Sequence, residues 1–442
     1  IETVLRQYPG VSDVRVTGSP EGPEGITAYI VLRPAERKPS QQPMGFGLFY
    51  FADSNSSSST EKYRLYLEGA KFADRHGFAS VWTPERHFHQ KGGLYPSPSV
   101  LSSALAVVTS QIRLRTGSVV MALHNPLRVA EEWSIVDNLS HGRVGLSFAS
   151  GWVANDFAFF PERFSNKREE MFRGIAEVQK LWRGEKILTR DGAGKMTEIG
   201  IFPRPIQPEL PIWLTCSGPP EMFAKAGELG FHVLTSLQEQ SFDEVSARLK
   251  IYREARSAAG YDPYTGHVAI MMHTFVGEDK DRVIEKVRGP MMSYLRSHID
   301  LIKTTTHSME NRSALNQEGV EESLAAFAFE RYRRNSSLIG TPQSCLPMIH
   351  QLKSIGVNEV ACLVDFGVDV DSVLASLEHL NTLRELCRKS AAPEPESVSE
   401  ETLAVFLQQR LPHAPAPRVL KIVDRLPAPD EMSVHVQAAV TR

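Results

Sequence analysis

The segment that decides the fold is His141-Gly-Arg-Val-Gly-Leu-Ser-Phe-Ala-Ser-Gly-Trp-Val-Ala-Asn-Asp-Phe157. Its apolar run, Val144 to Ala149, has the length of a buried strand and ends at Ser150-Gly151-Trp152. Small residues after a strand let a flat ligand lie against the backbone, and the tryptophan can wall the ligand in. The segment therefore predicts a strand end that binds a planar cofactor.

Strand-like and helix-like segments alternate over the middle of the chain. The strand-like segments are continuous apolar runs, which is typical of parallel strands covered by helices. Eight strands, each followed by a helix, predict a TIM-like (β/α)8 barrel of the α/β class, and a doubly wound sheet is the alternative. The predicted strands are 45–51, 80–82, 114–121, 144–149, 212–216, 232–235, 268–275 and 359–364, and the predicted helices include 61–76, 98–109, 126–139, 166–182, 219–229 and 242–259.

The barrel is predicted to be inserted into a small α+β subdomain. Polar, proline-containing linkers at 34–43 and 391–399 bracket it. The flanking zones are each too small to hold a core, so we expect them to pack together. The resulting parts are residues 1–40 and 391–442, which form the two pieces of the subdomain, and residues 41–390, which form the barrel.

Two excursions leave the predicted barrel. Residues 183–205 have the pattern of a small hairpin. Residues 278–334 are charged and partly helical, and they are too long for a passive connection, so they are a candidate lid. The first residues resemble neither a signal peptide nor a natural start, and we expect the chain to be a piece of a longer polypeptide.

The composition excludes several classes of function. Of the 442 residues, 42% are hydrophobic and 23% are charged, with a net charge of -3. We therefore expect no nucleic-acid partner, because such a partner requires a clustered basic surface. No run approaches a membrane span, so no membrane partner is expected. Four cysteines without CxxC spacing fit reduced thiols in a cytoplasmic protein.

The active face of such a barrel lies at the carboxyl ends of its strands. Ser217-Gly218-Pro219 joins a strand to a helix whose first N–H groups can bind a phosphate, although a plain helix cap is the alternative. Arg168 can supply a second phosphate contact or remain a solvated surface residue. His87 and His89 lack a third ligand at suitable spacing, so a metal site is not expected. Glu85 and His87 are expected as polar groups near a cofactor, and a loop pair that satisfies its own hydrogen bonds is the alternative.

Several motifs stand in order along the middle zone. They are Pro-Glu85-Arg-His-Phe, Thr116-Gly-Ser-Val-Val, His124-Asn-Pro-Leu-Arg-Val-Ala-Glu-Glu-Trp133, Gly142 to Trp152 with Asn155-Asp-Phe157, Gly340-Thr-Pro-Gln-Ser and Ile355-Gly-Val-Asn-Glu-Val. With these motifs the middle zone resembles the luciferase-like flavin monooxygenases over residues 44 to about 388. The family's paired histidines stand here as Arg86-His87.

The resemblance implies a barrel that binds FMN. Its isoalloxazine is expected between Gly117-Ser118 and the Ala149 to Trp152 strand end, and its phosphate at Arg168 and the Ser217 helix start. A cis peptide bond is expected at Gly117–Ser118. The implied cofactor-binding residues are Tyr50, Gly117, Ser118, Ala149, Ser150, Gly151, Trp152, Arg168, Ser217, Gly218 and Met222, and the implied catalytic residues are Glu85, His87 and Ser118.

The flanks resemble the C-terminal subdomain of nonribosomal peptide synthetase adenylation domains. The similar segments are residues 1–14, Phe406-Leu-Gln-Gln-Arg-Leu-Pro and Val423-Asp-Arg-Leu-Pro427. Where that family closes with Asn-Gly-Lys-Val-Asp, this chain has Glu431-Met-Ser433-Val-His435, so the lysine that contacts the acyl-adenylate is absent.

Together, the two resemblances imply an FMN-dependent monooxygenase of a synthetase. Reduced flavin from a separate reductase and molecular oxygen would hydroxylate an aminoacyl or peptidyl chain on a carrier protein. Embedded relatives in myxothiazol-type terminal modules imply the alpha carbon of a glycine unit, whose breakdown leaves a terminal amide. The expected partners are the carrier-tethered substrate, the remaining synthetase domains, the reductase and a second copy in a homodimer. Deazaflavin-dependent hydride transfer and a non-catalytic docking insert are the alternatives.

Overall fold

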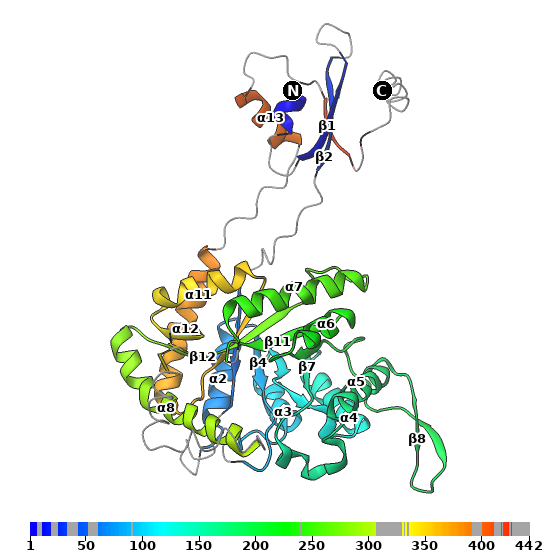
Figure 1. Cartoon of the computed structure of the whole chain (residues 1–442), viewed down its shortest axis with the longest axis vertical. Coiled ribbons are helices and arrows are strands. Elements are labelled where there is room, and N and C mark those ends of the chain that lie inside the picture. Colours follow the sequence, from blue (N-terminus) through cyan, green and yellow to red (C-terminus); the bar gives the residue numbers. More distant parts are fainter. Residues whose placement is uncertain are drawn as a thin grey trace. The chain divides into compact units, whose positions relative to one another are not determined.

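The computed structural model describes two compact units. One comprises residues 42–390, and the other combines Ile1–Gln41 with Ala391–Arg442. They are coloured along the sequence in Figure 1, and each is described by itself. The described residues are 1–6, 11–18, 25–32, 43–51, 61–89, 92–238, 240–305, 329–330, 332–333, 336–390, 400–410, 417, 419–423 and 426.

The larger unit is a closed barrel of eight parallel strands. Each strand pairs with the next one around the barrel, and β14 pairs with β3 to close it. The predicted TIM-like barrel is thus confirmed, and the doubly wound alternative is wrong. In barrel order the strands are β3 (Gly45–Phe49), β4 (Ser80–Thr83), β5 (Arg113–Thr116), β7 (Val144–Ala149), β10 (Ile212–Thr215), β11 (His232–Ser236), β12 (Val268–Val276) and β14 (Glu359–Leu363).

Helices surround the strands and bury the main core between the two layers. Local sequence fixes where they begin: the Asn125 side chain caps α4 beside a proline, and Ser241 with Glu244 forms a capping box for α7. The helices are α2 (Arg64–Arg75), α3 (Pro98–Val108), α4 (Pro126–Leu139), α5 (Lys167–Arg183), α6 (Pro220–Glu228), α7 (Phe242–Ala258), α8 (Lys280–Thr305), α11 (Pro342–Ser354) and α12 (Val370–Ser390).

The barrel interior contains a buried ion pair that the sequence analysis did not identify. The Glu359 carboxylate accepts hydrogen bonds from Arg115 and from the Trp82 indole, the latter at 2.8 Å. The Arg115 guanidinium lies 4.4 Å from the centre of the Trp213 ring. Burial opposes the charge of Glu359, but Arg115 and His267 outweigh it and hold its pKa far below the usual range. These contacts form a buried charged cluster between β4, β5, β10 and β14 in the barrel interior.

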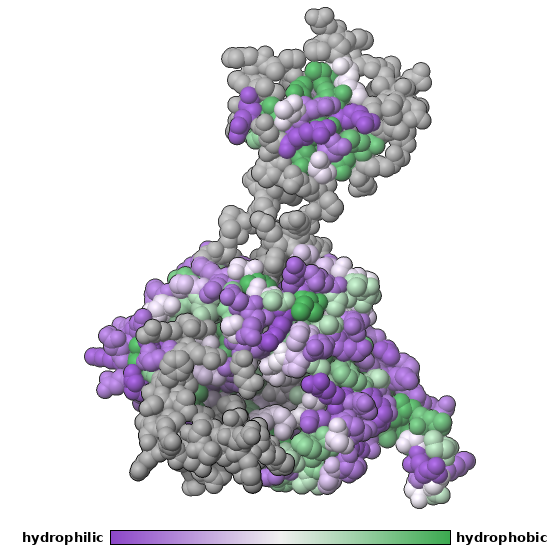
Figure 2. Space-filling view, viewed as in Figure 1, coloured by the Kyte–Doolittle hydropathy of each residue, from purple (hydrophilic) through white to green (hydrophobic). Residues whose placement is uncertain are grey.

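The structure describes the first predicted excursion from the barrel and part of the second. An antiparallel hairpin, β8 (Ile187–Arg190) and β9 (Met196–Ile199), confirms the prediction for 183–205. Figure 2 shows hydrophobic residues on it, where Leu188 and Met196 are exposed. The candidate lid begins with α8, but residues 306–328 lie outside the described residues. A short strand, β13 (Ser337–Gly340), pairs with β12 and was not predicted.

The smaller unit is built from both ends of the chain. The strands β1 (Val11–Thr17) and β2 (Thr27–Leu32) are antiparallel, and β15 (Val419–Ile422) pairs in parallel with β2. The helices are α1 (Glu2–Leu5) and α13 (Glu400–Arg410), and their leucines pack with the strands in one core. This mixed subdomain is interrupted in sequence by the barrel. Residues 391–399 and 431–435, and most of the 34–43 linker, lie outside the described residues.

In the part of the chain that the structure describes, no helix combines the length and apolar character needed to cross a membrane.

Candidate active site

The predicted strand 114–121 is divided into two short strands at the carboxyl rim of the barrel, meaning the strand ends and the loops that follow them. β5 ends at Thr116, and β6 (Val119–Val120) pairs with β7 after a cis Gly117–Ser118 peptide bond. A Cβ on residue 117 would collide with the Phe49 ring, so the backbone turns where only glycine fits. The expected cis bond is confirmed, and it brings Ser118 beside the end of β7.

The hydroxyl groups of Ser118, Ser147 and Thr215 lie close together at this turn. Ser118 is hydrogen-bonded to the Thr215 hydroxyl, and its Oγ lies 3.3 Å from that of Ser147. The hydroxyls of Ser147 and Thr215 are 2.8 Å apart. Each hydroxyl can donate one proton and accept others, so the group can relay a proton by rotation. Neither Ser147 nor Thr215 was singled out from the sequence, because they lie on strands far apart in the chain.

The end of β7 provides a half-buried backbone surface. Ala149, Ser150 and Gly151 are partly exposed, and Trp152 is 48% exposed. Gly151 has a φ of +80°, and a Cβ there would lie 2.7 Å from Val120 and 3.0 Å from the Phe157 ring. A side chain at this position would therefore be strained and crowded. The segment is thus a strand end formed by small, partly exposed residues, and its contact with a flat ligand stays a prediction.

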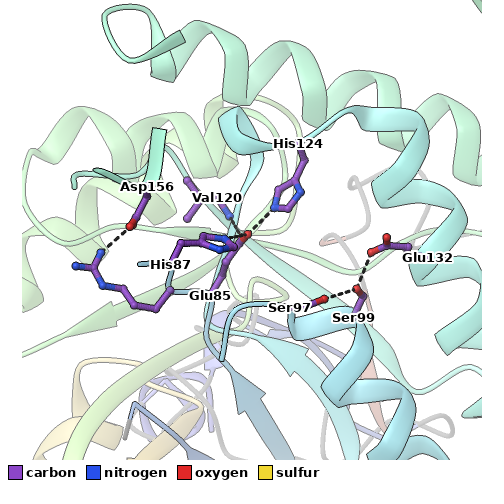
Figure 3. A network of polar contacts seen from close by, with 9 residues as sticks. Glu85, His87, Ser97, Ser99, Val120, His124, Glu132 and Asp156 are labelled. Carbon is purple, nitrogen blue, oxygen red and sulfur yellow. Dashed lines mark hydrogen bonds and ion pairs between the residues drawn. The ribbon is translucent and has the colours of Figure 1, made fainter. Parts of the chain in front are cut away.

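Glu85 is the centre of a buried polar network at the end of β4 (Figure 3). One of its oxygens, Oε1, accepts from Nε2 of His87 at 2.9 Å and from Nε2 of His124 at 2.6 Å. The other, Oε2, accepts from the Val120 backbone N–H at 2.7 Å. The carboxylate thus fixes the loop after β4 to the turn after β6. His124 lies in the 124–133 motif, but nothing in the local sequence indicates that it belongs to the site.

The network controls the protonation of its members. Burial acts to raise the pKa of Glu85, but the positive charge of His124 and the hydrogen bonds outweigh it, and the pKa is lowered. Burial acts in the opposite sense on His124, where Glu85 prevails and raises the pKa. An ionised carboxylate can only accept, so Nε2 of His87 carries a proton and its Nδ1 faces away from Glu85.

Arg86 points to a second buried partner. Its Nη1 donates to Oδ2 of Asp156 at 2.8 Å, and both side chains are buried. In Figure 3, Asp156 and His124 lie on opposite sides of Glu85. The Arg86 guanidinium also lies 5.4 Å from the centre of the Trp152 ring. Asp156 was quoted in the first segment of the analysis, but its role as the partner of Arg86 could not be derived from spacing.

The other predicted site residues are placed as follows. Ser217 is exposed and Gly218 has open space around it, just before α6, whose first turn has no side-chain cap. Met222 is partly buried within α6, and Arg168 is exposed in the first turn of α5. These positions leave a ligand phosphate room to approach.

Tyr50 is not brought to the rim, and its expected contact with the cofactor is corrected. It is fully buried against Tyr66, whose ring centre is 5.0 Å away on α2, and its hydroxyl lies against Gly69 of the same helix. In a strand successive side chains alternate between faces, so Tyr50 faces the helix layer while Phe49 faces the interior.

Comparison with known proteins agrees with this architecture. A relative, the oxygenase component of flavin-dependent trigonelline monooxygenase from Acinetobacter baylyi, is 25% identical over 354 residues, covering 76% of this chain and 93% of the relative. Monooxygenase RslO1 from Streptomyces bottropensis has a similar fold, with a TM-score of 0.66, 22% identity and coverage of 78% and 100% of the two chains.

Two further solved structures share the fold. The oxygenating constituent of 3,6-diketocamphane monooxygenase from Pseudomonas putida, in complex with FMN, has a TM-score of 0.62 at 17% identity, covering 78% of this chain and 98% of that one. An F420-dependent secondary alcohol dehydrogenase has a TM-score of 0.55 at 19% identity, covering 75% and 98%.

Residues 44–359 match the luciferase-like monooxygenase family. The chain belongs to this family, and it is an enzyme of the monooxygenase class. The family resemblance inferred from the motifs is confirmed.

Proposed function

We propose that the chain is an FMN-dependent monooxygenase that hydroxylates an aminoacyl or peptidyl chain held on a carrier protein. The observation that carries the flavin assignment is the small-residue backbone at Ala149 to Gly151 beside the cis Gly117–Ser118 turn, in a member of the luciferase-like family. The relative from Acinetobacter baylyi is described as flavin-dependent, which supports the same cofactor.

Residues of the rim fit the two ends of FMN. Gly117, Ser118 and the backbone from Ala149 to Trp152 would hold the isoalloxazine. The exposed Arg168, Ser217 and Gly218, with Met222 behind them, would hold the phosphate, since a helix start and a guanidinium both favour an anion. When bound, the reduced flavin supplies two electrons, so that one atom of molecular oxygen enters the substrate and the other leaves as water.

The chain's own residues would handle the protons. Glu85 positions His87 and fixes its tautomer, which leaves Nδ1 able to accept a proton from the substrate. Ser118 can pass a proton to the hydroxyls of Ser147 and Thr215. The aromatic rings of Phe88 and Phe159 contact the His87 ring. Both are exposed, so bound substrate or cofactor would have to cover them before water is excluded.

The specific reaction that we propose is hydroxylation of the alpha carbon in a glycine unit. One oxygen atom enters the C–H bond and gives N–CH(OH)–C(=O). Loss of the N–C bond then releases a terminal amide and leaves an aldehyde on the departing acyl group, with no further oxidant. Tethering on a carrier raises the local substrate concentration, so intrinsic affinity can be weak.

We further propose that the smaller unit is the C-terminal subdomain of an adenylation domain. Support comes from the quoted motifs and from a core that needs both ends of the chain, with Leu5 and Leu403 buried together. On this proposal the remaining synthetase domains, the carrier and the barrel belong to one assembly line. The missing lysine near Ser433 implies that this fragment does not contribute that contact to adenylation.

Two more partners complete the proposal. A separate reductase would supply reduced FMN, in keeping with a relative that is named as an oxygenase component. A second copy of the chain would cover an apolar face of the neighbouring helices α3 and α4. The exposed residues of that face are Val100, Val107, Ile135 and Leu139.

One experiment tests the central proposal. The protein is mixed with chemically reduced FMN, oxygen and a glycyl-peptidyl carrier, and the products are analysed by mass spectrometry. We expect a gain of one oxygen atom or release of the terminal amide. Reduced-FMN binding without either product would refute the substrate assignment, and no binding of FMN would refute the cofactor assignment.

The same preparation tests the alternative of hydride transfer with a deazaflavin, which the fold shared with an F420-dependent dehydrogenase favours. Quenching of deazaflavin fluorescence on binding, with no response to FMN, would establish that alternative. Binding of neither cofactor would refute both cofactor assignments.

A further inference from the structure

The Arg86–Asp156 pair is incompletely hydrogen-bonded although it is buried. Among the described residues, Nε and Nη2 of Arg86 and Oδ1 of Asp156 have no hydrogen-bond partner. Only one hydrogen bond, 2.8 Å long, connects the two side chains. A buried polar group without a partner loses its hydrogen bonds to water and gains none in return, so such groups are normally paired. Three of them together indicate a ligand-binding arrangement.

The opposite charges of Arg86 and Asp156 restrict the charge that a ligand bound to both can carry. Arg86 and Asp156 neutralise each other, so a phosphate or carboxylate would meet Asp156 at close range and gain little. Burial raises the pKa of Asp156 even beside the guanidinium, which shows that one contact does not compensate for desolvation. A fitting ligand is neutral and offers both an acceptor for Arg86 and a donor for Asp156.

The Trp152 side chain would have to move when such a ligand binds. Its ring lies over the Arg86 guanidinium, at 5.4 Å, and is 48% exposed. It belongs to the same strand end as Gly151, where we place the cofactor. A ligand that takes the position of the ring over Arg86 would therefore bind next to the proposed reaction centre.

We propose that Arg86 and Asp156 together bind an amide-type edge, in which a C=O lies next to an N–H. The carbonyl oxygen would accept from Nη2 of Arg86, and the N–H would donate to Oδ1 of Asp156. This proposal rests on the proposed function for its first source, the peptide-type amide of the tethered substrate. The isoalloxazine carries a similar edge and is the second source.

The test uses the whole chain and two separate titrations. N-acetylglycinamide is the amide probe, followed by tryptophan fluorescence and calorimetry, and acetate is the anionic comparison. FMN is titrated independently. The variants are Arg86→Met, Asp156→Asn and the double variant Arg86→Met with Asp156→Leu, which removes both charges at once. Arg128→Met, which breaks an exposed pair with Glu132, is the matched control.

We expect the wild-type protein and the Arg128 variant to bind the probe alike and to ignore acetate. The Arg86 and Asp156 variants should bind it at least about 10-fold more weakly, as for one charge-assisted hydrogen bond. Weaker probe binding with unchanged FMN binding identifies the substrate amide as the source. Weaker FMN binding with no probe binding to any protein identifies the isoalloxazine.

The proposal is overturned if both dissociation constants of the folded variants stay within about twofold of wild type. Circular dichroism and melting curves establish whether each variant is folded. If the single variants do not fold, the double variant is used instead, because it leaves no unpaired charge. This failure is distinct from failure of the proposed function, which would appear as loss of FMN binding by the wild-type protein itself.

Discussion

Replacing Glu85 with glutamine tests the network that holds the candidate base. The carboxylate accepts three hydrogen bonds, from His87, His124 and the Val120 N–H. The glutamine amide offers one acceptor oxygen and turns an N–H₂ group toward at least one of the three donors. Since a hydrogen bond to a charged group contributes about 1.5–3 kcal/mol, we expect the free energy of unfolding to fall by at least that amount.

The loss should depend on pH in a defined way. The folded-state pKa of Glu85 is lowered from 4.5, so its contribution is complete above about pH 4.5 and disappears as the pH falls through the folded value. The folded-state pKa of His124 is raised from 6.5, so its contribution is complete below about pH 6.5 and disappears as the pH rises through the folded value. The destabilisation by Glu85→Gln should therefore be largest between these two limits.

Urea unfolding at several pH values and NMR titration of the histidines provide the measurement. In Glu85→Gln the pKa of His124 should fall, because burial is then opposed only by the weaker effect of Glu132. Turnover should decrease about 10²-fold or more, as for a misoriented general base. Glu254→Gln is the control, because this exposed carboxylate pairs with the exposed Lys250 and should change stability by less than about 1 kcal/mol. Equal stability losses in both variants, or an unchanged His124 pKa, would refute the reasoning.

Three further predictions concern other parts of the molecule. Glu359→Gln should destabilise the barrel by about 3–5 kcal/mol in urea unfolding, because it leaves Arg115 buried without a counter-charge; a loss below 1 kcal/mol would contradict this account. Arg168→Ala should weaken FMN binding by about 1.5–3 kcal/mol, and an unchanged dissociation constant would remove Arg168 from the phosphate site. Val107→Asp should shift a dimer toward monomer in light scattering, and an identical mass for variant and wild type would exclude this face as the interface.

The strands of the barrel could be predicted because their pattern is local. Runs such as Val144 to Ala149 and the segment ending at Trp82 are buried on both faces, and continuous apolar sequence is sufficient to identify them. The small strand Ser337–Gly340 was missed because it follows a long charged segment that interrupts the alternation of strand-like and helix-like segments. The cis bond at Gly117–Ser118 came from family resemblance, since nothing in the local sequence specifies it.

The partners within the site could be predicted less well. The contact of Glu85 with His124 spans 39 positions, and that of Arg86 with Asp156 spans 70, so no local pattern connects them. The error at Tyr50 has a simpler cause. The residue lies one position past the end of β3, and the alternation of faces places its neighbour Phe49 in the interior instead.

Two neighbouring residues, Glu85 and Arg86, illustrate how the site divides its tasks. Both are buried and both form ion pairs, but Glu85 uses its two oxygens in three hydrogen bonds, whereas Arg86 and Asp156 leave polar atoms without partners in the described structure. A fully bonded group gains nothing from a ligand and serves to position others, while an incompletely bonded one gains on binding. Variants of Glu85 should therefore alter turnover more than ligand affinity, and variants of Arg86 should alter affinity first. If variants of Glu85 changed affinity and variants of Arg86 changed turnover, the ligand would have to contact the Glu85 side of the loop.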